Sequence, residues 1–321
     1  MRALITGGAG FIGSHLAEAL LAQAHAVTAV DNLSTGRLAN IEPLVEQHGF
    51  QFVYETVTNE TVMDRLVSEC DVIFHLAAAV GVELIVKDPV RTIETNLDGT
   101  DTMLRLARRY RKKILIASTS EVYGKSTELP FREEADRVMG PTTKHRWSYA
   151  ESKAIDEFLG LAYHKQFGLP VVICRFFNTV GARQTGTYGM VIPRFVKWAL
   201  AGEPVQVYGS GDQTRCFCNV KDTVRAVMAL AAEPKAVGEI YNVGSQEEIT
   251  VADLARRVLA RTGSRSPLVF VPYDQAYEKG FEDMFRRVPS LDKIKAAIGW
   301  QSTIPLDQTL DEVAAYFRAH P

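Results

Sequence analysis

The stretch TGGAGFIG at residues 6–13 decides the expected fold. It follows a short apolar run at residues 3–6 and leads into a helical apolar pattern at residues 15–24. The first glycine of such a turn permits a tight bend, the second lets the backbone approach a pyrophosphate, and the third lets helix and strand pack closely. The helix N-terminus offers free N–H groups and a partial positive charge to the anion. The stretch therefore predicts a dinucleotide-binding turn lined by Gly7, Gly10, Phe11, Ile12 and Gly13.

An acidic residue, Asp31, follows the strand predicted at residues 26–30. A carboxylate at this place can accept hydrogen bonds from both ribose hydroxyls of an adenosine, and it repels a 2′-phosphate. We therefore expect Asp31 and its neighbour Asn32 to bind the cofactor, and we expect NAD rather than NADP. Arg37 could hold a phosphate and weighs against that preference. A solvated aspartate that begins a turn is the alternative interpretation of Asp31.

The order of the predicted elements indicates an α/β fold. Short apolar runs at 72–76, 113–117 and 171–175 alternate with helical patterns at 95–110 and 152–167. Such alternation predicts βαβ units with right-handed crossovers, and hence a doubly wound parallel Rossmann sheet. After residue 175 the rhythm becomes irregular. We expect an NAD-binding domain over residues 1–175, to which a segment near 212–235 returns, and a smaller α/β substrate-binding domain over residues 176–321.

Composition excludes several other classes. The 321 residues are 46% hydrophobic, and 36 Lys+Arg stand against 38 Asp+Glu, so the formal net charge is -2. This balance disfavours a nucleic-acid partner, and the apolar content excludes disorder. No apolar run reaches the roughly 18 residues of a membrane span, and the N-terminus shows no secretory signal. The four cysteines form no CxxC pair, so we expect no metal site and a cytoplasmic location.

Tyr149 and Lys153 form a candidate catalytic pair in the stretch YAESK at 149–153. Residues four apart share one face of a helix. A free phenol has a pKa of about 10 and is a poor base at neutral pH, but a neighbouring ammonium favours the phenolate. Lys153 can also hold the ribose of a nicotinamide. A solvent-facing pair on an amphipathic helix is the alternative, but behind a dinucleotide-binding turn the spacing predicts a catalytic base.

The chain resembles the extended short-chain dehydrogenases/reductases that modify nucleotide sugars. The resemblance rests on TGGAGFIGSH at 6–15, DNLSTG at 31–36, HLAA at 75–78, STSEVYG at 118–124, YAESK at 149–153, RFFN at 175–178 and VYGSGDQTR at 207–215. It implies that Tyr149 takes a proton from a sugar hydroxyl while the hydride of the same carbon passes to the nicotinamide. Lys153 then tunes this tyrosine and Thr119 is its hydroxyl partner. His75 and Ala77 are expected to line the cofactor.

The same resemblance implies a substrate site in the C-terminal part of the chain. Asn178 is expected to contact the sugar diphosphate of a UDP-sugar. Gln206 and Tyr208 are expected to hold the nucleobase, with the tyrosine ring stacked on it. Arg215 and Arg287 occupy positions where the family reads phosphate or sugar groups.

The family also dimerises through two helices of each subunit, which implies a homodimer through the helices at 95–110 and 152–167. One segment departs from the family pattern. Many relatives carry an aspartate and a hydrophobic residue after the third strand, where adenine is recognised. Here that stretch is ETVT at 55–58, so an aspartate contact to adenine is not expected.

The triplet Thr119-Ser120-Glu121 bears on the reaction. Relatives with Thr-Asp-Glu are typically 4,6-dehydratases, and Ser120 replaces that aspartate. Thr-Ser-Glu resembles the UDP-glucuronate decarboxylases, as do KHRWSY at 144–149 and RCF at 215–217. Oxidation at C4 of a glucuronate makes its carboxylate a β-keto acid, which loses CO₂ without a metal. We therefore expect UDP-glucuronate decarboxylation, with Arg215 and Ser120 positioning the carboxylate and Glu121 assisting proton movement.

Three alternatives stay open. The stretch AAAVGV at 77–82 resembles an epimerase more than a decarboxylase, so a UDP-sugar or UDP-uronate 4-epimerase is the first alternative. A 4,6-dehydratase is the second, although the GDP-mannose enzymes with Thr-Ser-Glu usually prefer NADP, against Asp31. A non-catalytic NAD-binding protein is the third. Such proteins typically lose the tyrosine or the lysine, and this chain keeps Tyr149 and Lys153.

Overall fold

The structure is a computed structural model that describes residues 1–80, 88–186, 190–272 and 284–320. Its centre is a seven-stranded sheet with the order β11-β6-β5-β4-β1-β2-β3, and each neighbouring pair is parallel. The strands are β1 (Arg2–Thr6), β2 (Ala26–Asp31), β3 (Phe50–Tyr54), β4 (Val72–His75), β5 (Lys113–Thr119), β6 (Val171–Phe176) and β11 (Glu239–Val243). The order reverses between β1 and β4, as in a doubly wound Rossmann sheet. The predicted fold class is confirmed.

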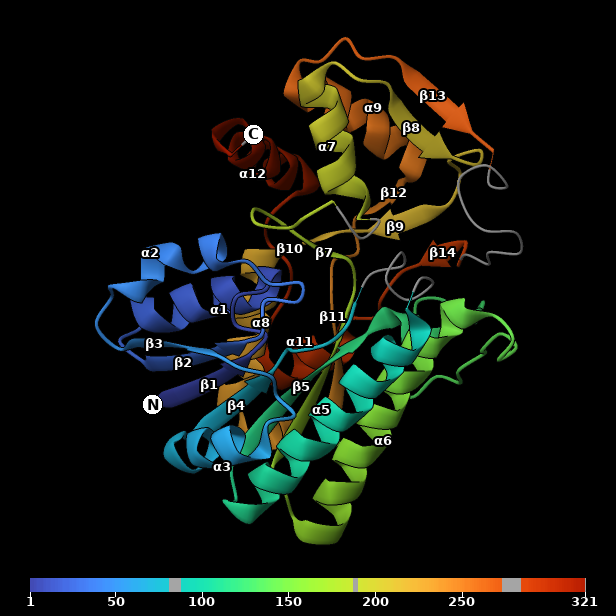
Figure 1. Cartoon of the computed structure of the whole chain (residues 1–321). Coiled ribbons are helices and arrows are strands. Elements are labelled where there is room, and N and C mark those ends of the chain that lie inside the picture. The colour runs from blue at the N-terminus through green and yellow to red at the C-terminus, as the bar shows by residue number, and fades with distance from the viewer. Residues whose placement is uncertain (81–87, 187–189, 273–283, 321) are drawn as a thin grey trace.

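Helices cover both faces of the sheet (Figure 1). One face carries α1 (Phe11–Ala22), α2 (Glu42–Val45), α8 (Val220–Ala232) and α11 (Asp292–Ile298); the other carries α3 (Glu60–Glu69), α5 (Pro89–Arg109) and α6 (Ser148–Phe167). The central strands read as nearly continuous apolar runs because both of their faces are buried. Leu16 and Leu20 pack on the first face, and Met103 and Leu106 on the second.

A smaller unit lies beyond the carboxyl edge of the large sheet (Figure 1). Its strands are β8 (Val205–Tyr208) paired with β13 (Leu268–Val271), and β9 (Thr214–Cys216) between β12 (Glu248–Thr250) and β14 (Arg286–Arg287). Its helices are α7 (Val191–Ala201), α9 (Val251–Thr262) and α12 (Leu306–Ala319). β7 (Thr179–Val180) pairs with β10 (Cys218–Asn219). These two strands lie where the chain leaves the large sheet for the smaller unit and where it returns. A separate apolar core holds the unit together around Phe195, Leu254 and Leu310.

After residue 176 the chain returns to the large sheet with α8, β11 and α11. Residues after 175 therefore belong partly to the large sheet and partly to the smaller unit, and the expected domain boundary at residue 175 stays a prediction. The return of α8 lies within the segment expected near 212–235. Residues 176–321 thus contribute both to the large sheet with its covering helices and to the smaller unit.

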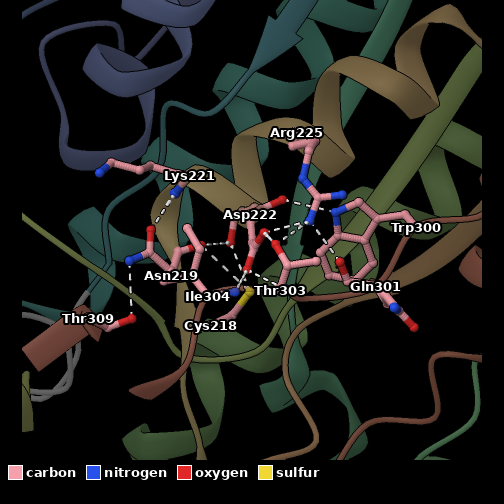
Figure 2. A network of polar contacts seen from close by, with 11 residues as sticks. Cys218, Asn219, Lys221, Asp222, Arg225, Trp300, Gln301, Thr303, Ile304 and Thr309 are labelled. Carbon is pink, nitrogen blue, oxygen red and sulfur yellow. Dashed lines mark hydrogen bonds and ion pairs between the residues drawn. The ribbon is translucent and has the colours of Figure 1, made fainter. Parts of the chain in front are cut away.

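A network around Asp222 fixes the segment between α11 and α12 (Figure 2). Asp222 lies in the first turn of α8, and its carboxylate accepts hydrogen bonds from the backbone N–H groups of Thr303 and Ile304 at 2.8 and 2.9 Å. Arg225 donates to the same carboxylate at 2.5 Å, and the Trp300 indole donates to the Asp222 carbonyl. Burial opposes ionisation of Asp222, but these bonds outweigh it and hold the pKa below its ordinary value.

Candidate active site

A cleft of about 770 Å³ runs along the carboxyl ends of the parallel strands and under the smaller unit. This edge is where open α/β sheets bind ligands, at the point where the strand order reverses. Every side chain or glycine predicted for the site lines the cleft except His75. The lining includes Gly7, Gly10, Phe11, Ile12, Gly13, Asp31, Asn32, Ala77, Thr119, Ser120, Glu121, Tyr149, Lys153, Asn178, Gln206, Tyr208, Arg215 and Arg287.

The glycine turn joins β1 to α1 at one end of the cleft. Gly7 has a φ of +70°, a conformation that disfavours residues with a side chain. A Cβ atom on Gly13 would lie 2.1 Å from the carbonyl oxygen of Gly7, so the helix can approach the turn only without one. α1 begins at Phe11, and Gly10 provides no side-chain cap. The N–H groups of the first helical turn therefore face a site that suits a pyrophosphate.

Asp31 ends β2 beside this turn. Its carboxylate accepts hydrogen bonds from the N–H groups of Ala9 at 3.0 Å and Leu33 at 2.8 Å. Burial raises the pKa of Asp31, although these bonds act in the opposite direction. Gly36 lies against the carboxylate, since a Cβ there would stand 2.7 Å from either oxygen. Asp31 is thus a buried cleft residue and not a solvated turn residue, and its place fits recognition of a ribose.

The predicted catalytic pair lies at the start of α6. Tyr149 and Lys153 are almost fully buried, and the Thr119 hydroxyl at the end of β5 stabilises the phenolate form of Tyr149. Burial raises the pKa of Tyr149 above its ordinary range, and the charges of Glu121 and Asp156 raise it further. The sequence predicts that the Lys153 ammonium favours the phenolate, and this stays a prediction. In the protein alone burial outweighs the groups that lower the pKa of Tyr149, and Lys153 is itself paired with Asp156 at 2.7 Å.

Glu121 stands at the centre of an arginine cluster in the same cleft. It lies on the 3₁₀ turn Ser120–Tyr123 that follows β5. Arg146 reaches its carboxylate at 2.5 Å and Arg287 at 3.6 Å, and Arg215 adds a third positive charge nearby. Burial opposes ionisation of Glu121, but the guanidinium groups outweigh it and keep its pKa below the ordinary value. Three guanidinium groups thus gather around one carboxylate in the cleft, an arrangement that suits recognition of a carboxylate ligand.

Sequence reasoning did not select Arg146 as a site residue. Arg146 lies in the 3₁₀ turn His145–Trp147, directly before the catalytic helix, and it is buried and lines the cleft. Arg146 lies three residues before Tyr149, within the stretch at 144–149 that carries the resemblance, and this position could have indicated it.

His75 lies behind the cleft wall and not in it. Its Nδ1 atom is 2.8 Å from the Thr6 hydroxyl and its Nε2 atom is 3.2 Å from the Thr100 hydroxyl. Burial lowers the pKa of His75 to about 3, so the ring is neutral. The expectation that its side chain lines the cofactor is not met, because β4 turns this side chain into the core. Ala77 does face the cleft.

The predicted substrate residues occupy the other end of the cleft. Asn178 has a φ of +33° and donates from Nδ2 to the carbonyl of Cys216. Gln206 and Tyr208 lie on β8. Arg194 on α7, which the sequence did not suggest, stacks over the Tyr208 ring at 4.7 Å and approaches its hydroxyl at 3.4 Å. An aromatic ring backed by a guanidinium forms a platform suited to a nucleobase.

Two segments noted in the sequence also border the cleft. Residues 55–58 line it beside Asp31, where the family usually recognises adenine. Residues 77–80 line it next to β4, and the remainder of AAAVGV, residues 81 and 82, lies outside the described residues. Within the described ranges, no group of three or more His, Cys, Asp or Glu side chains could hold a metal ion. No helix in those ranges is both long and apolar enough to cross a membrane.

Comparison with known proteins places this cleft in context. A family model described as GDP-mannose 4,6 dehydratase matches residues 4–313. The chain is 44% identical to a UDP-N-acetyl-alpha-D-glucosaminuronate decarboxylase of Bacillus cytotoxicus, covering 99% of this chain and 98% of that protein. It is 38% identical to UDP-glucuronic acid decarboxylase 1 of Danio rerio, covering 98% of this chain and 72% of that protein.

Solved structures show the same fold. A UDP-glucuronic acid 4-epimerase from Bacillus cereus, in complex with UDP-glucuronic acid and NAD, superposes with a TM-score of 0.89 at 29% identity over the whole of both chains. A dTDP-glucose 4,6-dehydratase from Streptomyces venezuelae, with NAD bound, gives a TM-score of 0.89 at 29% identity. That match covers 99% of this chain and 97% of the dehydratase.

Proposed function

The chain belongs to the GDP-mannose 4,6-dehydratase family of extended short-chain dehydrogenases/reductases, and from this premise we propose that it is an NAD-dependent decarboxylase of a UDP-linked uronic acid. Membership of this family makes the protein an enzyme that acts on nucleotide sugars through NAD. The decarboxylase assignment rests on the relatives that share its full length and on one feature of the cleft. That feature is the arginine cluster around Glu121, which lies beside the Tyr149–Thr119 pair.

The residues present fit NAD. The glycine turn and the first turn of α1 offer a place for a pyrophosphate. The buried carboxylate of Asp31 offers a place for an adenosine ribose. Lys153 and Tyr149 lie in the same cleft, where they would meet the nicotinamide ribose. When bound, the nicotinamide accepts a hydride from the sugar and can return it. All other steps can be assigned to side chains of this chain.

Tyr149 carries the first step. Its phenolate takes the proton of the C4 hydroxyl as the C4 hydrogen leaves as hydride, so that C4 becomes a ketone. The Thr119 hydroxyl stabilises the phenolate, and Lys153, one helical turn further along α6, is held in place by Asp156. Enclosure of Tyr149 excludes water and strengthens these electrostatic effects.

The arginine cluster carries the second step. With C4 oxidised, the C6 carboxylate is β to a ketone, so the C5–C6 bond can break and its electron pair can pass into an enolate. CO₂ leaves, and a proton must then return to C5. We assign to Arg215, Arg287 and Ser120, which line the same cleft, the orientation of the carboxylate. To Glu121, held ionised by the guanidinium groups, we assign the guidance of proton movement.

A labelled substrate tests the proposal. Purified protein is incubated with NAD and with UDP-glucuronate or UDP-N-acetylglucosaminuronate carrying ¹³C in the carboxyl group. Labelled CO₂ and a UDP-pentose, or its 4-keto form, are the expected products. Both substrates are tested, because the relatives include a decarboxylase named for each of them. An epimerised UDP-uronate without labelled CO₂ would overturn decarboxylation.

A UDP-uronate 4-epimerase is the second candidate. It is favoured by the full-length structural similarity to the epimerase of Bacillus cereus and by the small side chains at residues 77–79. Epimerisation needs the same Tyr149 and Lys153 and the same recognition of the carboxylate. It differs in that the keto sugar must rotate before the hydride returns and the C5–C6 bond must stay intact.

We also propose a homodimer through α5 and α6. These helices pack against each other, and they expose Ile93, Ile155 and Phe158, the last of which is 66% exposed. Exposed apolar side chains on two adjacent helices suit a bundle with the same helices of a second copy. A cytoplasmic location belongs to this proposal as well, since Cys70, Cys174, Cys216 and Cys218 are free thiols.

A further inference from the structure

The catalytic lysine has a buried counter-charge that the Y-x-x-x-K pattern does not include. Lys153 Nζ lies 2.7 Å from Asp156 Oδ2, one helical turn further along α6. The two side chains are 2% and 0% exposed. An unpaired ammonium at this depth would be strongly disfavoured, as would an unpaired carboxylate. Each charge is therefore tolerated because the other is present.

The carboxylate of Asp156 depends on few other groups. Burial raises the pKa of Asp156 and the nearby charge of Glu157 acts in the same direction, whereas Lys153 and the Thr100 hydroxyl favour the ionised form. Within the part of the chain that the structure describes, Oδ1 of Asp156 has no hydrogen-bond partner. Lys153 is thus the main support of this charge, and the pair acts as a unit.

A hydrogen-bonded row of residues stands behind the pair. The Ala77 N–H donates to the Thr6 hydroxyl at 3.2 Å, and His75 Nδ1 lies 2.8 Å from the same hydroxyl. The neutral ring carries one proton, so it donates to one of the Thr6 and Thr100 hydroxyls and accepts from the other, with Nε2 at 3.2 Å from Thr100. Thr100 lies on α5 next to Asp156. Residues of β1, β4 and α5 therefore fix the threonine that faces the carboxylate.

The pair also acts on the phenol. The groups that face Tyr149 are Glu121 and Asp156, which raise its pKa, and Arg146 and Thr119, which lower it. Burial of the phenol is the largest cause of its raised pKa. Among the charges, Glu121 is already compensated by arginines of the cluster. Asp156 is the acid that a single substitution can remove without disturbing those arginines.

We propose that Asp156 is a positioning residue of the oxidation step: it holds the Lys153 ammonium beside Tyr149, offsets its charge, and so sets the pH at which Tyr149 accepts the substrate proton. This inference rests on the proposed C4 oxidation. It adds to the Tyr149–Lys153 pair a third residue whose contribution is exerted through the lysine. Thr100 and His75 are its supports.

The test compares Asp156→Asn with Glu157→Gln. Both variants neutralise one buried acid on the same turn of α6, but Glu157 pairs with Arg175 and not with Lys153. Ultraviolet difference titration of the cofactor-free proteins, each against its own Tyr149→Phe double variant, isolates ionisation of this phenol. We expect Asp156→Asn to move that ionisation to lower pH by about one unit, because a negative neighbour is lost. Glu157→Gln should leave the midpoint unchanged even if the melting temperature falls.

The second measurement is the pH profile of the oxidation itself. In a single turnover with NAD and UDP-glucuronate, formation of reduced nicotinamide should reach its plateau at lower pH in Asp156→Asn, with the Kd for UDP-glucuronate within about twofold of wild type. Thr100→Val, which keeps Asp156 but removes its neighbouring hydroxyl, should shift the profile in the same direction by less. This variant serves if Asp156→Asn does not fold.

The outcomes separate the two proposals. If the wild-type enzyme forms reduced nicotinamide but Asp156→Asn and Thr100→Val keep its midpoint in both measurements, the role of Asp156 is refuted. A shift of equal size in Glu157→Gln would also refute it, because the effect would then be a general response to losing a buried acid. If wild-type enzyme reduces no NAD with either UDP-uronate, it is the proposed function that fails, and the phenol titration still tests Asp156.

Discussion

Arg146 and Glu121 form an ion pair inside the cleft, with 2.5 Å between Nη1 and Oε2 and only 4% and 12% of their side chains exposed. The pair links the turn before the catalytic helix to the turn after β5. We expect Arg146→Met to lower the free energy of unfolding by about 3 kcal/mol, because it leaves a buried carboxylate without its nearest partner. Chemical denaturation measures this loss. The double variant Arg146→Met/Glu121→Gln should recover part of it; a double variant less stable than Arg146→Met would contradict the explanation.

Tyr149→Phe removes the proposed base while it keeps the ring. Because the side chain is buried and its hydroxyl faces Thr119, the variant should fold and bind UDP-sugars as the wild type does. We expect the rate of C4 oxidation to fall by roughly 1000-fold, the range lost when a general base is removed. Stopped-flow absorbance of reduced nicotinamide gives the rate. Full turnover in this variant would exclude the mechanism.

Arg287→Gln tests recognition of the substrate carboxylate. Arg287 lines the cleft and lies 3.6 Å from Glu121. We expect the KM for UDP-glucuronate to rise by about tenfold, whereas the affinity for UDP-glucose, which has no carboxylate, should change little. Arg286→Gln is the matched control, because Arg286 is half exposed and pairs with Glu248 away from the cleft. Equal losses for the two sugars would argue against a carboxylate contact.

Asp222→Asn tests the network at the start of α8. The folded-state pKa of Asp222 is lowered, so its stabilisation is present above the usual aspartate range and is lost as the pH falls through that lowered value. We expect the variant to be less stable than wild type by roughly 2 kcal/mol near neutral pH. The difference should shrink in acid. Thermal unfolding at a series of pH values measures it, and a constant difference down to low pH would refute the linkage.

Phe158→Asp tests the proposed dimer. Phe158 is 66% exposed on the outer face of α6, so the substitution costs little in the monomer. A buried charge at a helix-bundle interface is strongly unfavourable, and we expect the sedimentation coefficient to change from that of a dimer to that of a monomer. Phe270→Asp, on β13 of the smaller unit, should leave the dimer intact. A wild-type monomer, or a Phe158→Asp dimer, would contradict the interface.

The sequence predicted the parallel sheet and most of the cleft because both depend on local patterns. Buried parallel strands appear in the sequence as short apolar runs, and the spacing of the glycines is enough to predict the glycine turn. Helix starts were less accurate. α5 begins at Pro89 and not near residue 95, since Asp88 caps the N–H of Arg91 and proline suits a first turn. The first turns of α5 contain many polar residues, so the spacing of apolar residues did not reveal where the helix begins.

Two of the residues that sequence reasoning missed owe their importance to partners that are distant in the sequence. Arg194 matters because β8 brings Tyr208 under it, and Arg146 because Glu121 lies beyond the end of β5. Asp156 is one turn from Lys153, yet nothing in the pattern says that this helix face is enclosed. The raised pKa of Tyr149 has the same origin, because burial depends on packing that composition does not reveal.

The course of the chain after β6 limits how the protein can be divided. β11 forms hydrogen bonds with the whole outer edge of β6, and α8 and α11 cover the apolar side chains next to it. A fragment that stops at residue 176 would keep the glycine turn and the catalytic helix, but it would leave a bare strand edge and an uncovered sheet face. Such a truncated protein should aggregate instead of binding NAD, so the two halves of the chain must be produced together.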